Sequence, residues 1–418
     1  MEMVLEFLRD VLSQPALLIG IMSCVGLVAL KRPFHKVMTG TLKPILGYLM
    51  LAAGAGVIVS NLDPLGKMIE HGFHITGVVP NNEAIVAVAQ KVLGVETMSI
   101  LVVGLLMNLC IARFTKFKYV FLTGHHSLFM ACLMSAVLGT AGLSGMELIL
   151  VGGFLMGAWS AISPAIGQSY TSKVTDGDEI AIGHFGSLGY YLSAWVAQYV
   201  GKAEDSTEDI EIPEKWGFLR DSTLSTALTM IVFYLIAAIA AGSEFVSTLS
   251  GDMSPYLYAV MSAMNFAVGV TIVYSGVRMI LGDLIPAFQG IATKIIPNAI
   301  PAVDCAVFFT YAPTAVVLGF LSSFIGGIIG MLILGAVGGV LIIPGLVPHF
   351  FCGATAGIYG NATGGRRGAA VGAFLNGLAI TFLPAMALPV LGQLGFQNTT
   401  FGDADFAVMG LVLGNAYE

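Results

Sequence analysis

Residues 175–191, TDGDEIAIGHFGSLGYY, bring three carboxylates, four glycines and one histidine together in a chain that is otherwise mostly apolar. Of the 418 residues, 56% are apolar and only 10% are charged, and the mean hydropathy is +0.88. Soluble domains are closer to half apolar and a quarter charged. The composition therefore predicts a protein embedded in a lipid bilayer, where a polar, glycine-rich segment needs a functional reason.

The composition and motifs argue against several other classes of function. The net charge is −7 without any basic cluster, so no nucleic acid partner is expected. The five cysteines stand singly without metal-ligand spacing, and the chain has no G-x-S-x-G, Walker or H-E-x-x-H motif. We therefore expect no catalytic residue, no cofactor and no bound metal. The first apolar segment lacks a basic start and a cleavage site, which favours a retained membrane span.

A helix needs about 20 apolar residues to cross a bilayer. Segments of this kind occur at residues 13–30, 41–60, 96–113, 118–139, 144–168, 222–242, 255–275, 276–296, 312–334, 334–348 and 368–397. They predict an all-α polytopic membrane protein with ten or eleven transmembrane helices. The apolar stretch after Phe401 is short for a span, so either it folds back or the last span is absent.

Basic loops favour the cytoplasmic side of a membrane. The two densest basic loops are residues 31–43 and 113–118, whereas residues 244–254 contain no lysine or arginine. This pattern places both basic loops and the acidic segment 201–222 in the cytoplasm, with the N-terminus outside.

Two glycine-rich segments, residues 176–200 and 351–380, do not fit simple spans. Glycine frees backbone groups that lipid cannot satisfy, so such segments persist at membrane depth only when they are buried in protein or line a cavity. Both segments are predicted to form re-entrant helical hairpins, with tips at Gly183, Gly186, Gly364 and Gly365.

A weak internal repeat is also visible. Residues 45–56, ILGYLMLAAGAG, match the spacing of residues 280–290, ILGDLIPAFQG. Broken elements at matching positions of two halves point to the binding site of a transporter. We predict one transporter unit, residues 1–418, with a first repeat at 1–200, a cytoplasmic linker at 201–221 and a second repeat at 222–418. Span counting does not distinguish inverted from parallel repeats.

Acidic and histidine side chains within spans are expensive, so they usually mark a substrate path or a proton relay. Glu83 either lines such a path or caps the helix that begins near it. Asp304 either accepts backbone N–H bonds or binds sugar hydroxyls. His126 is interpreted as interfacial, and Asp283, which has basic neighbours, as structural. The remaining candidates are His125 and His184.

Histidines, acids and aromatic rings together suit a polyhydroxylated ligand. Imidazoles and carboxylates donate to or accept from hydroxyls, and an aromatic face can cover the apolar side of a sugar ring. Phe129, Phe185 and Tyr190 are available for this role, and packing is the alternative for each.

Four segments carry a resemblance to a known family. They are LTGHH at residues 122–126, VTDGDEIAIGHFGS at 174–187, GVRMILGDLIPAFQGIATKIIPNAIPAVDCAVFFTYAPTAVVLGF at 276–320, and LIIPGLVPHFFCGATAGIYGN at 341–361. In order and spacing they resemble the L-ascorbate-type membrane component, enzyme IIC, of the bacterial phosphoenolpyruvate-dependent sugar phosphotransferase system. The similarity covers nearly the whole chain.

The resemblance implies a homodimer in the bacterial inner membrane, with about eleven spans per protomer. Each protomer would have a scaffold domain and a moving core domain that carries the two re-entrant hairpins. L-Ascorbate, or a closely related sugar acid, would cross by an elevator-type movement. A partner IIB protein would phosphorylate it from a phosphocysteine, with IIA acting indirectly, so the chain itself would be a permease rather than an enzyme.

Matched residue by residue, the family's site falls on His125, His184 and Asp304. Compared with one well-known member, this chain has Phe129 and Phe185 in place of glutamines. That member also has a tyrosine near the position of Glu83. The residues expected to bind substrate are therefore Glu83, His125, Phe129, His184, Phe185, Asp304, Cys305 and Ala306.

Three alternatives to ascorbate uptake follow from these residues. An ionised Glu83 facing the ascorbate anion would be unfavourable, so either it points away or the substrate is another sugar or polyol, including a neutral one. A proton-coupled sugar carrier would use Glu83, His184 and Asp304 as its relay. An integral-membrane enzyme would use His125 and His184 as bases or metal ligands.

Overall fold

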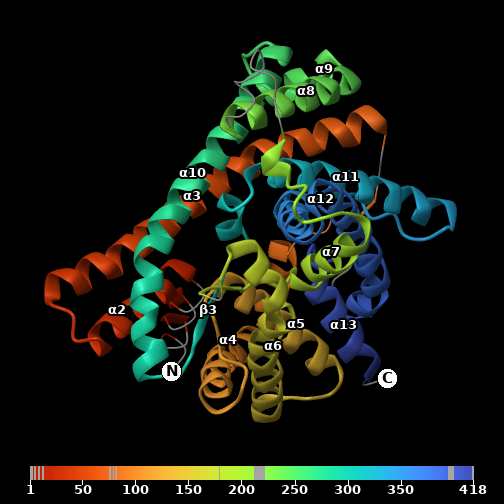
Figure 1. Ribbon diagram of the computed structural model, residues 1–418. Coiled ribbons are helices and arrows are strands. Elements are labelled where there is room, and N and C mark those ends of the chain that lie inside the picture. The colour runs from red at the N-terminus through yellow and green to blue at the C-terminus, as the bar shows by residue number, and fades with distance from the viewer. Residues whose placement is uncertain are drawn as a thin grey trace.

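The computed structural model describes residues 3, 6–7, 10–11, 14–74, 77–78, 80, 82–177, 179–210, 222–393 and 400–416. Most of these residues are helical, and the helices form two packing groups (Figure 1). Contacts within each group are extensive, whereas contacts between the groups are sparse. The two groups are described in turn because the cavity lies between them.

The first group, called here the α3–α10 group, is built on two long helices that cross each other (Figure 1). A Cβ atom on Gly47 of α3 would lie 2.9 Å from the carbonyl oxygen of Gly276 in α10, and one on Gly54 would lie 2.8 Å from that of Gly269. Small residues permit this close approach of membrane helices. The members of the group are α2 (Pro15–Ala29), α3 (Phe34–Phe73), α8 (Ser222–Ala241), α9 (Ser243–Ser250) and α10 (Pro255–Lys294).

The second group, called here the sheet group, surrounds three short strands. Its members are α4 (Asn82–Phe114), β1 (Tyr119–Phe121), α5 (Gly124–Thr140), α6 (Gly145–Thr175), β2 (Ala181–Ile182), α7 (Ser187–Val200), η1 (Thr207–Asp209), β3 (Ile300–Val303), η3 (Cys305–Thr310), α11 (Pro313–Ala336), α12 (Leu346–Gln393) and α13 (Ala404–Ala416).

The strands form a parallel sheet in the order β1-β3-β2. Hydrogen bonds continue one residue past the ladder, from the Leu122 N–H to the Ala302 carbonyl (2.9 Å) and from the Gly183 N–H to the Val303 carbonyl (2.7 Å). The loops that follow all three strands therefore emerge at the same edge. The all-α prediction missed this sheet, because strands of two to four apolar residues have no periodicity of their own.

The second predicted hairpin contains the expected turn. Helix α12 is interrupted at Gly364 (φ −143°, ψ 16°) and Gly365 (φ 59°, ψ −154°). Its two arms then pack closely, since a Cβ on Gly360 would collide with the Gly368 carbonyl. The first predicted hairpin is instead a short extended segment followed by helix α7. Whether either segment is re-entrant in a membrane stays a prediction.

The predicted linker is partly described. Residues 201–210 fold against the α12 turn: the Thr207 N–H donates to Asn361 Oδ1 (2.8 Å), and the Arg366 N–H donates to the Asp205 carbonyl (2.8 Å). Residues 211–221 lie outside the described part of the chain. The division into two repeats stays a prediction.

The number of spans stays a prediction. Among the described residues, six helices are long and apolar enough to cross a membrane, or seven if Thr226–Ala241 and Ser243–Ser250, bent by 116°, form one span. Ten or eleven were predicted. The segments 255–275 and 276–296 are one continuous helix, α10, with Pro286 inside it. A window of about 20 apolar residues divides so long a helix into two apparent spans.

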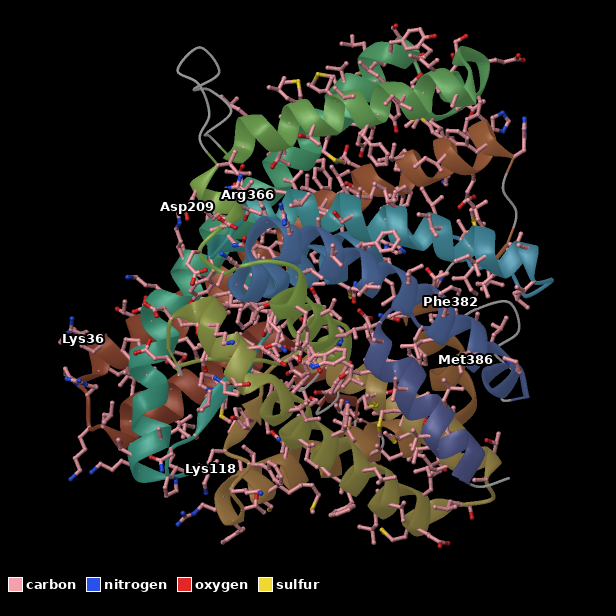
Figure 2. All side chains as sticks on the ribbon, turned by 45° about the vertical axis from the view of Figure 1, so that its right-hand side comes forward. Lys36, Lys118, Asp209, Arg366, Phe382 and Met386 are labelled. Carbon is pink, nitrogen blue, oxygen red and sulfur yellow. The ribbon has the colours of Figure 1, made fainter. Side chains whose placement is uncertain are left out.

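Four labelled charged residues lie on the same side of the molecule in one view. Lys36, Lys118, Asp209 and Arg366 lie on the left-hand side of Figure 2, whereas Phe382 and Met386 lie on the right. The two basic loops and the α12 turn therefore share one side of the molecule. That this side is the cytoplasmic one stays a prediction from the rule for basic loops.

We expect Gly365→Ala to lower the free energy of unfolding by about 1–3 kcal/mol. Gly365 has a left-handed φ of 59°, and a Cβ there would collide with the carbonyls of Lys202 and Asp205. Thermal unfolding in detergent measures the effect. Gly56→Ala is the matched control, because a Cβ at Gly56 meets nothing within 4 Å. Equal melting temperatures for the two variants would contradict this account of the turn.

Candidate functional site

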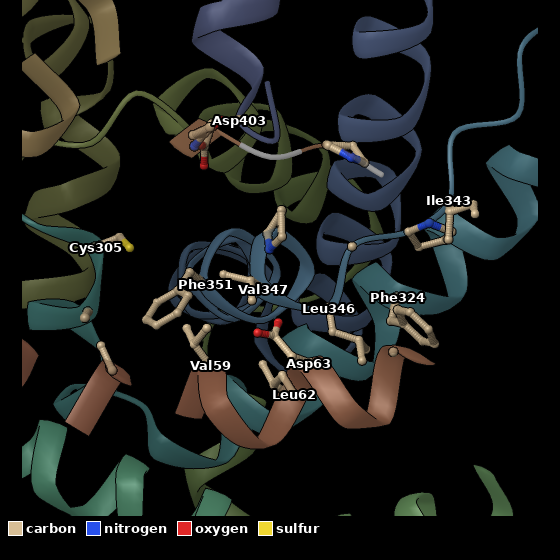
Figure 3. A pocket seen from close by; sticks show the side chains of 18 of the residues that line it. Val59, Leu62, Asp63, Cys305, Phe324, Ile343, Leu346, Val347, Phe351 and Asp403 are labelled. Carbon is tan, nitrogen blue, oxygen red and sulfur yellow. The ribbon is translucent and has the colours of Figure 1, made fainter. Parts of the chain in front are cut away.

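A cavity of about 1330 Å³ lies between the two packing groups. Figure 3 shows Val59, Leu62 and Asp63 on α3 facing Val347 and Phe351 of α12. On the α3 side the lining is apolar from Leu51 to Leu62, preceded by the Tyr48 ring. Charged residues appear only toward the far end of α3, at Asp63, Lys67 and Glu70. The histidines of the lining all come from the sheet group.

The parallel sheet explains why distant residues meet in this cavity. His125 follows β1, His184 follows β2 and Asp304 follows β3, so each lies just past the carboxyl end of a strand. All three line the cavity. His125 Nε2 lies 3.5 Å from Asp304 Oδ2. The structure therefore brings together three residues that are up to 179 positions apart (304 − 125).

The hydrogen bonds of His184 define its tautomer. Its Nδ1 accepts the backbone N–H of Gly186 (3.1 Å), and the Tyr190 hydroxyl lies 2.8 Å from the same atom. An N–H group can only donate, so Nδ1 carries no proton in the neutral ring, and Nε2 carries it instead. His184 is 5% exposed and lines the cavity. It can therefore offer a buried N–H donor there.

His126 is a residue that the sequence interpretation misplaced. It is 3% exposed, and its ring centroid lies 3.8 Å from that of His184. Its Nδ1 accepts the Phe185 backbone N–H (3.3 Å). It also lines the cavity rather than facing an interface. The sequence of helix α5 could have indicated this burial, because a helix that is apolar on every side is usually buried on every side.

Two roles were expected as alternatives for Asp304, accepting backbone N–H bonds or binding sugar hydroxyls. They can fall to different oxygens of its carboxylate. Oδ1 accepts the Ala306 N–H (3.1 Å) at the start of η3, while Oδ2 lies beside His125. Cys305 and Ala306 line the cavity next to it, each 1% exposed. The carboxylate is therefore held in place through one oxygen and keeps the other directed to the cavity side.

A second polar cluster contains Asp403, which sequence reasoning did not identify. Asn82 Nδ2 donates to Asp403 Oδ2 (2.5 Å), and the Cys352 thiol donates to Asp403 Oδ1 (2.7 Å). Asp403 and Asn82 line the cavity. The segment after Phe401 thus reaches the site before helix α13 packs against α5, α7 and α12.

Asp405, two residues further on, has a structural role. It accepts the Ser187 hydroxyl (2.8 Å) and the Leu188 N–H (2.9 Å) at the N-terminus of α7, and it is fully buried. A carboxylate at this place caps the helix and is favoured by its dipole. Asp405 therefore fixes α7, and with it the loop that carries His184.

Phe185 is a correction to the expected site. It is fully buried, and its ring stacks on Phe121 with centroids 4.6 Å apart, outside the cavity lining. Successive residues of an extended segment point to opposite faces, so His184 and Phe185 face different surroundings. Phe129, one turn after His125 on α5, does line the cavity.

The other predicted residues are placed as follows. Glu83 lies in the first turn of α4, and its side chain is outside the described part of the structure. Gly183 and Gly186 flank His184 in the loop before α7. The turn at Gly364 and Gly365 lies against residues 197–205, at the end of α7 away from His184.

Two groups of donor atoms could hold a metal ion. The ligand atoms of His184, Asp304 and Cys305 lie within 4.8 Å of one another, and so do those of His184, Cys352 and Asp403. All five residues are buried. No metal-ligand spacing reveals these groups in the sequence, because their members come from four separate segments of the chain.

Comparison with known proteins matches residues 10–405 to the family described as the PTS system sugar-specific permease component. A curated relative is the Ascorbate-specific PTS system EIIC component of Mycoplasma pneumoniae, with 27% identity over 424 residues. That match covers 87% of this chain and 63% of the relative, so the chain spans less than two thirds of the relative's length. With its apolar helices, the chain belongs to the PTS sugar-specific permease family and is a multi-pass membrane protein.

Proposed function

We propose that this protein carries L-ascorbate, or a closely related sugar acid, across the bacterial inner membrane as the membrane component of a phosphotransferase system. The observation that carries the proposal is the asymmetry of the cavity. Its histidines come from the sheet group, and the facing wall on α3 is apolar between Leu51 and Leu62. A binding site held by one body can move past such a wall without breaking polar contacts to it.

Hydrogen bonds within the sheet group support its movement as a rigid body. The strand ladder joins the segments that carry His125, His184 and Asp304. At the edge of the group, Glu208 accepts N–H groups from Thr314 and Ala315 at the start of α11. Because contacts to the α3–α10 group are sparse, we assign the sheet group as the moving core and the α3–α10 group as the scaffold of an elevator.

The course of the cavity supports an outward-facing state. Its α3 lining begins at Tyr48 and extends to Phe73, at the end of α3 remote from the Lys36 loop. Since the Lys36 side is assigned to the cytoplasm, the cavity runs from the histidines toward the outside. In this state a sugar would reach the site from outside before the core moves.

The polar groups of the cavity suit a sugar acid. His184 offers an N–H donor, and the N-terminus of α5 at Gly124 adds a partial positive charge that favours anions. Asp304 and Asp403 can accept hydrogen bonds from hydroxyl groups. Phe185 lies outside the cavity, so we expect its replacement of a glutamine to leave substrate choice unchanged. Of the two phenylalanines, only Phe129 is expected to influence the substrate.

The phosphoryl transfer is assigned to a partner rather than to this chain. We propose that a IIB protein phosphorylates the sugar from its phosphocysteine on the cytoplasmic side, with IIA supplying IIB. We also propose that two copies of the chain form a homodimer. We assign the basic loops around Lys36 and Lys118 to the cytoplasm, and we propose that the sugar leaves on this side, where IIB would act.

Uptake of labelled ascorbate by cells expressing the protein tests the coupling. Accumulation should require both IIB and phosphoenolpyruvate and should persist when a protonophore removes the proton gradient. Uptake that ignores IIB but collapses with the proton gradient would contradict the proposal and favour a proton-coupled carrier instead.

We expect Phe185→Ala to reduce stability and Phe129→Ala to reduce substrate binding. Phe185 is fully buried between Phe121 and Phe406, so its truncation should lower the free energy of unfolding by about 3–5 kcal/mol. Phe129→Ala should mainly weaken ascorbate binding. Thermal unfolding with and without ligand separates the two effects, and a changed ligand preference in Phe185→Ala at unchanged stability would show that our placement of Phe185 is wrong.

A further inference from the structure

Asp403 directly precedes α13, at the position from which an aspartate normally caps a helix by accepting the N–H two or three residues further on. The nearer of these donors, the Asp405 N–H, instead donates to the Phe185 carbonyl (2.9 Å). Asp403 itself lines the cavity and is 5% exposed. It is therefore a buried acid of the cavity wall, where a charge is costly unless it has partners.

Two donors from distant segments hold the Asp403 carboxylate. Asn82 Nδ2 donates to Oδ2 (2.5 Å), and the Cys352 thiol donates to Oδ1 (2.7 Å). Asn82 is itself fixed, because its Oδ1 accepts the Gly402 N–H (2.9 Å). The first turn of α4, the first arm of α12 and the segment before α13 therefore meet at one carboxylate. Each of its oxygens has a further lone pair with which it can accept a hydrogen bond from a ligand.

His184 has two carboxylates beside it. A ring nitrogen of His184 lies within 4.8 Å of an Asp304 oxygen, and a ring nitrogen lies within 4.8 Å of an Asp403 oxygen. Asp304 belongs to the segment after β3, and its Oδ2 lies 3.5 Å from His125 Nε2 in the first turn of α5. Asp403 belongs to the segment before α13. A ligand that contacts the His184 donor can therefore reach both carboxylates with different hydroxyl groups.

The two ends of an ascorbate ion suit different parts of this site. One end is a negatively charged lactone ring, and the other is a two-carbon side chain with two hydroxyls. An ionised carboxylate only accepts hydrogen bonds, so it repels the charged ring oxygen and binds hydroxyl donors. The His184 N–H and the N-terminus of α5 favour the charged ring. This division leaves the side chain of the sugar acid to Asp403.

We propose that Asp403 binds the side-chain hydroxyls of the substrate and so selects sugar acids that have a hydroxylated side chain. Asn82 and Cys352 are its positioning residues, because each fixes one oxygen of the carboxylate. The inference rests on the proposed function, since it takes an ascorbate-type sugar acid as the substrate. It adds the part of the substrate that determines selection and the residue that recognises it.

Isothermal titration of the purified full chain with two ligands tests the assignment. The ligands are L-ascorbate and an analogue that keeps the anionic ring but has an ethyl group as its side chain. The wild type should bind the analogue at least about tenfold more weakly than ascorbate. Asp403→Asn should weaken ascorbate binding about tenfold, because a neutral amide oxygen is the weaker acceptor, and should change analogue binding by less than about twofold. A merely structural role of Asp403 would weaken both ligands equally.

Variants of the two positioning residues test how Asp403 is held. Cys352→Ser keeps an O–H donor for Oδ1, so it should bind ascorbate within about twofold of the wild type. Cys352→Ala and Asn82→Ala each remove a donor and should weaken ascorbate binding about fivefold, with analogue binding unchanged. Cys132→Ala is the matched control for truncating a buried thiol. Cys132 is fully buried on α5 and outside the cavity lining, so both affinities should stay at the wild-type values.

Unchanged ascorbate binding in Asp403→Asn, or equal losses for the two ligands, would overturn the inference and leave the proposed function intact. Equal losses in Cys352→Ser and Cys352→Ala would show that the thiol does not position Asp403 as a donor. A wild-type protein that does not bind ascorbate would contradict the proposed function, and this inference with it. Thermal unfolding of each variant checks that the fold is kept.

Discussion

Replacing His184 by alanine is expected to weaken ascorbate binding by about 10- to 150-fold, the equivalent of about 1.5–3 kcal/mol for a hydrogen bond to a charged group. The reason is the fixed tautomer. Gly186 and Tyr190 engage Nδ1, which leaves Nε2–H as a donor directed by the structure rather than by the ligand. Isothermal titration of the purified protein measures the loss.

Two further variants separate binding from folding. His184→Gln can place an amide donor near the Nε2 position, so it should retain part of the affinity. His184→Asn keeps an acceptor near Nδ1 but offers no donor at Nε2, so it should bind as weakly as His184→Ala while unfolding at nearly the wild-type temperature. His35→Ala, at an exposed position at the start of α3, is the control. Wild-type affinity in His184→Asn would show that His184 does not contact the sugar.

The second large effect is expected for Asp304→Asn, which should weaken ascorbate binding at least tenfold. The amide oxygen can still accept the Ala306 N–H and so preserve the start of η3, as Oδ1 does now. What is lost is the Oδ2 acceptor beside His125, which we assign to a sugar hydroxyl. The measurement is again isothermal titration, accompanied by thermal unfolding.

Because ascorbate is an anion, Asp304→Asn also discriminates between two electrostatic effects. Removing a carboxylate lowers repulsion, whereas removing an acceptor costs a hydrogen bond. We expect the lost hydrogen bond to weaken binding more than the reduced repulsion strengthens it. Tighter ascorbate binding in Asp304→Asn would therefore contradict it. Asp283→Asn, whose carboxylate lies 3.7 Å from Lys43 and away from the cavity, should bind like the wild type.

The membrane class and the family could be predicted from the sequence, and both are confirmed. Composition alone indicates a lipid environment, and four ordered motifs carry the family. The turn at Gly364 and Gly365 was also predictable, because a glycine pair inside an apolar helix permits a backbone that other residues resist. The length of α10 was not predictable, because windows of about 20 apolar residues divide this continuous helix at residues 275 and 276.

The candidate site was only partly predictable. His125, His184 and Asp304 were identified from motifs, and their meeting depends on a sheet whose strands are too short to give a pattern. Asp403 was missed because it lies in the tail, where a carboxylate next to an apolar helix is most simply a cap. Phe185 was misassigned because sequence adjacency to His184 does not fix the direction of a side chain in an extended loop.

The most direct test of the central claim, that this cavity binds an ascorbate-type sugar acid, is a thermal-unfolding screen of the purified protein. Ascorbate at 100 times its dissociation constant should raise the free energy of unfolding by about 2.7 kcal/mol. The increase should disappear in His184→Asn, and neutral sugars and polyols should have no effect at equal concentration. Stabilisation by a neutral polyol but not by ascorbate would contradict the account.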